Sequence, residues 1–272
     1  MNASKFIYQF LTVSILITAG FACSSDDDDN GNVNPPAAPT GSTVLDMRIF
    51  ADGNDVERGD LFSINNDYDF RILETRFYVS NFEFQNTNGD WIDAEPNVLL
   101  LDVRDQGTNK HVLDIPEGDY VAMRYLIGLD SATNRMFPTD FPREHPLSAF
   151  QATHWNWNLF YRFIIVEGRV NTYGNFAPAS DTTRFNIPLS IHPGTDDMLV
   201  EKETQFNETL SVTASGTNKR MIFSVNVNDW VSGPGGEWDP LTENQGHAEP
   251  HDYEQTKKFG ANFGASVSVH VE

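Results

Sequence analysis

The sequence of 272 residues contains 39 Asp and Glu but only 18 Lys and Arg, which gives a formal net charge of −21. This acidity argues against nucleic acid as a partner, because phosphates require clustered basic side chains. The single cysteine excludes internal disulfides and thiolate metal centres, so a bound metal would need histidine, carboxylate or carbonyl ligands.

Residues 1–22 have the pattern of a secretory signal peptide. Lys5 is followed by an uncharged, mostly apolar run that is too short to be a membrane span. Cys23 at the cleavage point predicts the lipid-modified first residue of a bacterial lipoprotein; the alternative is an ordinary signal peptide that leaves a free thiol. The acidic run Ser24–Asp29 resembles the surface-export tag of some Gram-negative lipoproteins. We therefore expect an outer-membrane lipoprotein, attached through its lipid and exposed at the cell surface.

Residues 23–42 are rich in Asp, Asn, Pro, Gly and Thr and have hardly any large apolar side chain. Such a segment cannot bury enough surface to offset the entropy of ordering, so we expect an acidic, proline-containing tether. The folded part is expected to span residues 43–272 as one domain. Its length and its aromatic content of 12% suit one large core.

Alternation of apolar and polar side chains dominates the sequence after residue 43, as in half-buried strands. The expected strands lie at residues 45–49, 70–85, 98–103, 119–128, 160–170, 184–192, 205–213, 221–227 and 267–271. A short C-terminal helix is expected over Asp252–Phe259, and Ile72–Val79 fits either a helix or a strand. The predicted fold is all-β: a β-sandwich, immunoglobulin-like in architecture, that ends in a C-terminal strand.

Two segments, 129–153 and 232–254, do not fit alternating strands and turns. Both are long and contain several prolines or glycines. Loops of this length on a compact scaffold are usually functional or disordered. These loops are therefore the first places to search for a functional site.

The densest group of chemically versatile residues is His154-Trp155-Asn156-Trp157. On an extended strand the two tryptophans share one face and His154 lies on the other. The group could form the wall of a metal or ligand site, or it could be a tryptophan-rich core strand. His192 ends an apolar strand beside a turn. This position suits a metal ligand, and it equally suits a structural histidine at the strand edge whose ring nitrogens are hydrogen-bonded.

His247 and His251 have the i, i+4 spacing that places two ligands on one face of a helix. Pro250 lies between them and disfavours a regular helix through both histidines. The sequence contains no Gly-x-Ser-x-Gly, His-Glu-x-x-His or phosphate-binding glycine loop. Nothing singles out a pair of acids for glycoside hydrolysis either. We therefore expect no enzymatic activity from the chain alone.

Several motifs in a fixed order resemble the MbnP-like family, methanobactin-associated copper-binding proteins that are common as bacterial lipoproteins. The matching segments are Arg76–Phe82, Gly118–Tyr120, Arg124–Ser131 with Asn134, Trp155–Trp157, Tyr161, Glu167–Gly168 and His192–Gly194. Together they span roughly residues 43–272. Two positions depart from the family pattern: Trp157 occupies the second place of a Trp-x-His arrangement, and Phe160 replaces the glycine before the tyrosine.

The resemblance implies a β-sandwich with a copper site, in which histidines lie beside a tryptophan that a di-haem cytochrome peroxidase-like partner oxidises to kynurenine. By its place in the motif, Trp155 would be the modified residue. His154 and His192 would be the copper ligands, with His251 as a third. The expected function is copper acquisition or handling by a lipoprotein at the cell surface or facing the periplasm.

Two other functions remain open from the sequence. The chain could be a glycan-binding accessory lipoprotein of an outer-membrane uptake system, because sugar rings stack on the faces of tryptophans such as Trp155 and Trp157. It could also be a structural surface domain without a ligand. In that case both tryptophans would be buried, and no two histidines would be close enough to share an ion.

Overall fold

The computed structural model describes residues 40–102, 110–156, 159–181, 183–215 and 219–272. The predicted signal peptide, Cys23 and the tether up to residue 39 lie outside these residues, as does Trp157. The first strand begins at Thr40, so the last three residues assigned to the tether belong to it. Across the described residues, no helix combines the length and apolarity that a membrane-spanning segment needs.

The smaller of the two main sheets has the order β18-β14-β1-β2. β7 pairs with the same edge of β1 as β2 does, at the opposite end of the strand. Its strands are β1 (Thr40–Ala51), β2 (Asn54–Asp55), β7 (Lys110–Pro116), β14 (Arg220–Asn226) and β18 (Val267–Val271). β1 and β14 run parallel, while β18 is antiparallel to β14 and forms an edge of the sheet. The expected C-terminal strand is therefore present.

The larger sheet has nine strands built around β4 (Tyr68–Asn86), in the order β13-β8-β4-β11-β12-β17. β8 and β11 pair with different parts of one edge of β4. Three short strands, β3, β5 and β6, pair with its opposite edge. The remaining bounds are β3 (Leu61–Ile64), β5 (Trp91–Asp93), β6 (Val98–Asp102), β8 (Gly118–Ile127), β11 (Ile164–Thr172), β12 (Ile187–Ile191), β13 (Val200–Val212) and β17 (Gln245–Gly246).

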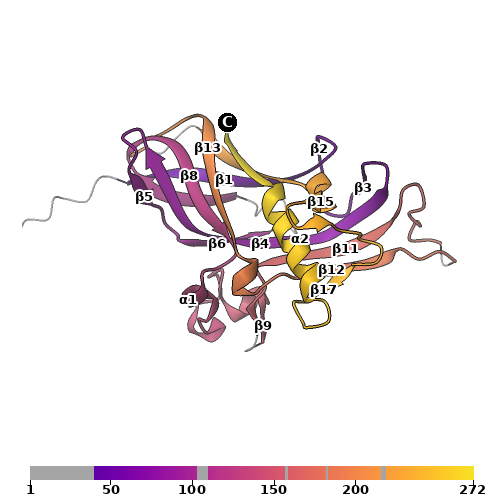
Figure 1. Ribbon diagram of the computed structural model, residues 1–272. Coiled ribbons are helices and arrows are strands. Elements are labelled where there is room, and N and C mark those ends of the chain that lie inside the picture. The colour runs from indigo at the N-terminus through magenta and orange to yellow at the C-terminus, as the bar shows by residue number, and fades with distance from the viewer. Residues whose placement is uncertain (1–39, 103–109, 157–158, 182, 216–218) are drawn as a thin grey trace, which may run out of the picture. The chain divides into compact units, whose positions relative to one another are not determined.

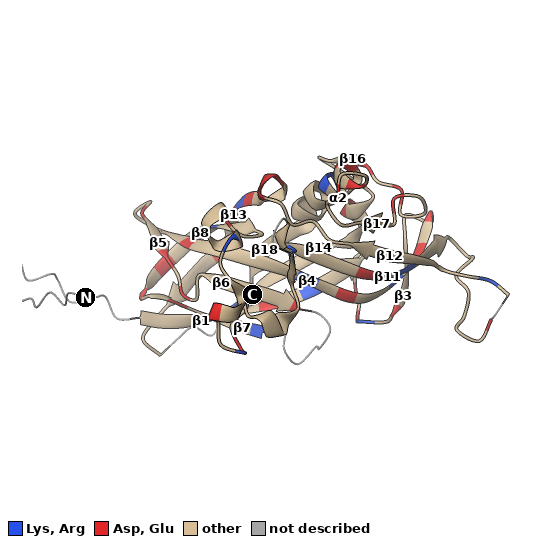
Figure 2. Ribbon diagram, turned by 90° about the horizontal axis from the view of Figure 1, so that it is seen from below, with Lys and Arg blue, Asp and Glu red and all other residues tan. Residues whose placement is uncertain are grey.

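The two sheets pack face to face and form the all-β sandwich that the alternation predicted (Figure 1). Alternate side chains of both sheets enter one apolar core. Tyr125 of β8, for example, meets Phe223 of β14 with ring centroids 5.1 Å apart. The ambiguous segment Ile72–Val79 is strand, because it lies inside β4 with hydrogen-bonded neighbours on both sides. Figure 2 marks Asp and Glu positions in red on the ribbon, where they occur on many strands and loops of the domain.

The C-terminal helix is longer than the sequence suggested: α2 spans Tyr253–Ser266 instead of ending at Phe259. Its second half is held by packing, because Phe263 lies against both Phe77 and Trp230. Gly264 does not end the helix. It allows a close approach to Val200, where an added Cβ would come within 2.7 Å of a valine methyl.

Both long loops carry short elements. The 129–153 loop contains α1 (Ser131–Asn134) and the 3-10 helices η2 (Pro138–Asp140) and η3 (Ala149–Gln151). It leads into the hairpin of β9 (His154–Asn156) and β10 (Phe160–Tyr161). The 232–254 loop contains β15 (Ser232–Gly233), β16 (Gly236–Glu237) and β17, after η5 (Val227–Trp230); a fourth 3-10 helix, η4, spans Asp196–Met198.

Candidate metal centre

Two histidines meet at the ends of neighbouring parallel strands. In the pairing of β12 with β17, Ile191 is the partner of Gly246. The residue that follows each strand is a histidine: His192 after β12 and His247 after β17. The His192 backbone N–H donates to the Gly246 carbonyl at 2.6 Å. The centroids of the two imidazole rings are 5.0 Å apart.

Trp155 completes this group from a different part of the chain. Its indole centroid lies 5.7 Å from the His192 ring and 5.1 Å from the His247 ring. The Arg162 guanidinium lies 5.1 Å from the indole centroid and hydrogen-bonds the Thr153 carbonyl. Trp155 retains 36% of its surface exposed, so the indole lies at the boundary between the site and solvent. We call Trp155, His192 and His247 the ring cluster.

The 129–153 loop is fixed where it enters the β9–β10 hairpin. The Tyr78 hydroxyl donates to the Pro146 carbonyl at 2.9 Å and lies 2.6 Å from the Thr153 hydroxyl. In β10, Phe160 pairs with Asn156 at a break in the strand register, and its φ of 54° is in the left-handed region that favours glycine. The hairpin thus holds Trp155 against the end of the large sheet.

A carboxylate and a hydroxyl lie beside the two imidazoles. Glu167 of β11 is the cross-strand partner of Ser190, and its Oε1 is 3.1 Å from His192 Nε2. The Ser190 Oγ lies 3.5 Å from Nε2 of each histidine. His192 Nδ1 is buried and has no hydrogen-bond partner among the described residues. A carboxylate that accepts from one ring nitrogen fixes the tautomer and leaves the other nitrogen able to bind a metal.

The surroundings of His192 keep its imidazole neutral. Burial, followed by the positive charge of Arg162 and by His247 and Arg76, lowers the pKa of His192 to about 3. The side chain is only 4% exposed. A metal would therefore meet little competition from protons at this residue.

Asp252 holds the backbone on the other side of the site. Its carboxylate, 3% exposed, accepts from the backbone N–H groups of His247 at 3.0 Å and Glu249 at 2.8 Å. The His247 Nδ1 lies 3.7 Å from the same carboxylate. Asp252 immediately precedes α2, so the helix and the His247 loop are fixed together.

The structure brings only part of the predicted set of site residues together. His192 and Trp155 are in the ring cluster. His154 points elsewhere, as expected for the residue next to Trp155 on a strand, and its ring packs edge-on against Tyr161 at 5.0 Å. His251 is 80% exposed beside Asp252. Trp157 and Cys23 lie outside the described residues.

His247 is the member that the sequence did not single out, although its spacing to His251 drew attention to the segment. Its position depends on parallel pairing between β12 and β17, which are far apart in the chain. Local patterns do not encode such pairing. The available signal was a histidine directly after a glycine in a loop already selected as functional.

The donor set limits which metal could bind. Within the described ranges, no three His, Cys, Asp or Glu side chains are grouped so that they could hold a metal ion. The hollow bounded by the ring cluster, Tyr161 and Gly194 is too small for a water molecule. The ring cluster therefore offers two imidazoles and no thiolate. Imidazole is a good ligand for copper, and the buried, unpartnered His192 Nδ1 fits such a role.

Comparison with known proteins identifies the family of the chain. The sequence model of the MbnP family matches residues 40–247. A solved structure of MbnP from Methylosinus trichosporium is similar, with 17% identity, a TM-score of 0.46, and coverage of 85% of this chain and 98% of that chain. No curated protein matches the sequence. The family match covers most of the chain and confirms the resemblance seen in the motifs: the chain belongs to the MbnP family.

Proposed function

We propose that this chain is a copper-binding lipoprotein for copper acquisition or handling, and that His192 and His247 hold the ion beside Trp155. The observation that carries the proposal is the ring cluster. Two imidazoles from distant segments lie 5.0 Å apart, and one of them is buried and neutral, with a ring nitrogen that has no hydrogen-bond partner among the described residues.

The low number of ligands favours copper over zinc. Structural zinc sites are almost always four-coordinate, and catalytic zinc usually has three protein ligands. Cu(I) accepts two nitrogen ligands with a weak third one. Glu167 and Ser190 lie beside the imidazoles, where they orient the rings and exclude alternative hydrogen bonds.

Trp155 is the residue that we propose a haem partner oxidises. Conversion of tryptophan to kynurenine adds one dioxygen equivalent across the indole C2–C3 bond, which breaks, and hydrolysis then releases C2 as formate. A peroxide-activating di-haem protein would supply the oxidising equivalents. The partial exposure of Trp155 leaves it accessible from outside, and its contact with both imidazoles would place the new carbonyl beside the metal.

The ring cluster supports metal binding better than glycan binding. A sugar needs an open indole face, but the Arg162 guanidinium packs over the Trp155 ring and two imidazoles lie against it. Placement at the outer-membrane surface through lipid on Cys23 belongs to the same proposal, and its support is the leader and the acidic run in the sequence.

Cu(I) competition with a chromophoric chelator tests the proposal on the purified domain. We expect one equivalent of copper to bind, and His192→Ala and His247→Ala each to abolish retention. His251→Ala is the matched control, because that side chain is exposed and outside the ring cluster. Equal copper retention by all three variants would overturn the assignment. Mass spectrometry of the Trp155 peptide from natively exported protein tests the oxidation separately.

A further inference from the structure

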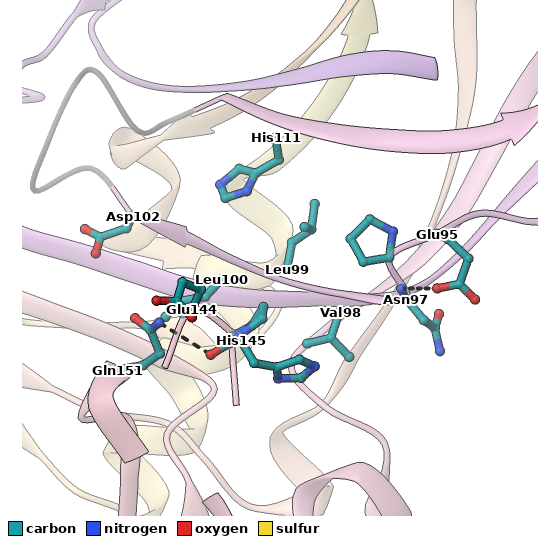
Figure 3. A pocket seen from close by; sticks show the side chains of 12 residues that line it. Glu95, Asn97, Val98, Leu99, Leu100, Asp102, His111, Glu144, His145 and Gln151 are labelled. Carbon is teal, nitrogen blue, oxygen red and sulfur yellow. Dashed lines mark hydrogen bonds between the residues drawn. The ribbon is translucent and has the colours of Figure 1, made fainter. Parts of the chain in front are cut away.

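A groove lies away from the ring cluster, along the strand β6. It is a groove of about 700 Å³ whose floor follows β6 and the preceding turn, including Val98 and Leu100. His111 of β7 enters from one side, and Glu144 and His145 of the 129–153 loop enter from the other (Figure 3). The groove thus runs beside a strand, between two walls.

Within the described residues, the strand beneath the groove has a paired strand along one edge alone. That partner is β4, where Leu100 is opposite Tyr78. The Tyr78 N–H donates to Phe163 and its carbonyl accepts from Gly128, so both of its backbone groups point away from β6. Backbone groups alternate along an antiparallel pair, so Leu100 and Val98 also direct theirs away from β4. Among the described residues these groups have no backbone partner.

β7, on the opposite side of the groove, also directs backbone groups into the groove. Asp114 of β7 exchanges both backbone hydrogen bonds with Glu95, at 2.9 and 2.6 Å, and this bridge closes one end of the groove. Beyond the bridge the two strands belong to different sheets, because β6 pairs with β4 and β7 pairs with β1. By alternation from Asp114, the backbone groups of Val112 point away from β1. The groove is therefore a gap between two sheet edges.

The charge of the groove selects its occupant. Its lining includes Glu95, Asp102 and Glu144 and contains no Lys or Arg among the described residues. His111 adds a buried Nε2 without a hydrogen-bond partner in the described part of the chain, and burial lowers the pKa of this histidine. An extended segment with an apolar centre and basic ends matches both the apolar floor and the acidic ends.

We propose that this groove binds an extended, basic segment of a partner protein by β-strand addition to β6. Main-chain hydrogen bonds to Val98 and Leu100 would fix the segment, and basic side chains would meet Glu95 and Glu144. Five residues of β6 give a contact about 17 Å long at ~3.3 Å per residue. The proposal does not depend on copper binding, because the groove shares no lining residue with the ring cluster.

The test uses the peptide acetyl-Lys-Val-Thr-Val-Lys-amide and two matched probes: the same peptide with N-methylated valines, and one with Glu in place of Lys. Binding is followed by amide chemical shifts of the labelled domain. We expect saturable shifts at Val98, Leu100 and Val112 with the first probe. N-methylation should weaken binding about tenfold through loss of main-chain hydrogen bonds, and the acidic probe should not bind.

Protein variants separate main-chain from electrostatic contributions. Val98→Pro removes an outward N–H at the first residue of an edge strand, where proline is tolerated, and Val98→Thr retains it. We expect the first variant, but not the second, to lose about tenfold in affinity. Glu144→Gln should weaken binding of the basic probe, whereas Glu254→Gln on α2 should not. No shift at these amides, or equal binding of the N-methylated probe, would overturn the proposal.

Discussion

His192 and His247 lie side by side because each directly follows the last residue of one of two parallel strands. Their rings are 5.0 Å apart, although 54 residues separate the two positions in the chain. The register Ile191 to Gly246 sets this arrangement, so it is a property of the sheet and not of either loop alone. Glu167 orients one of these rings, that of His192.

Replacing Glu167 with glutamine should lower copper affinity without unfolding the protein. The carboxylate lies 3.1 Å from His192 Nε2, and loss of such an orienting partner typically costs about 10- to 100-fold in metal affinity. Chelator competition measures the change. Glu201→Gln, at an exposed carboxylate of β13, is the control and should bind copper as the parent does. An unchanged affinity in Glu167→Gln would show that Glu167 does not orient His192.

Tyr78→Phe should destabilise the domain by about 1–3 kcal/mol, because it leaves the part-buried Pro146 carbonyl and the buried Thr153 hydroxyl without this partner. Chemical denaturation measures the free energy of unfolding. Tyr173→Phe, at a tyrosine that is 51% exposed, is the matched control and should change stability little. Because Thr153 precedes the β9 strand, copper affinity should fall in the first variant as well.

Phe263→Ala should cost about 3–5 kcal/mol, because it opens a cavity where α2 packs on Trp230 and Phe77. Thermal or urea unfolding measures the loss. Phe185→Ala, at a ring that is 83% exposed, removes the same atoms from the surface and should be close to neutral. Similar effects of the two substitutions would contradict the packing described for the second half of α2.

Stability should fall in acid partly through His111. Burial lowers the pKa of His111 below its usual 6.5, against a smaller opposing effect of the Asp102 carboxylate; Glu95 and Glu144 line the same groove. The unfolded state then binds more protons as the pH drops below about 6.5, so the folded state loses stability in that range. The stability contributed by the neutral imidazole is fully present above pH ~6.5.

His111→Gln should reduce this pH dependence. The difference in unfolding free energy between the parent and the variant should change by at most about 1.4 kcal/mol per pH unit below pH ~6.5 and be constant above it. His270→Gln, at a partly exposed histidine of β18, is the control for loss of an imidazole. If the difference in unfolding free energy between the parent and His111→Gln stayed constant from neutral to acid pH, the lowered pKa of His111 would be contradicted.

The all-β class, most strands and the family could be recognised from the amino-acid sequence alone. Alternation has a period of two on any half-buried strand, so segments such as 45–49 and 221–227 could be recognised from their own residues. Trp155 and His192 could also be selected from the sequence, because a tryptophan cluster and a histidine at a strand end are local features. The length of α2 was missed, since Gly260 and Gly264 look like helix breakers until the close packing is known.

Which histidines meet depends on contacts between distant parts of the chain. His154 is next to Trp155 in sequence, yet strand geometry sends its ring to Tyr161 on the other side. His251 shares its loop with His247 but is left in solvent, because Asp252 binds the backbone N–H of His247 and sets the path of the loop. Parallel pairing of β12 with β17 joins distant segments through backbone hydrogen bonds, which any sequence can form, so side-chain patterns do not reveal it.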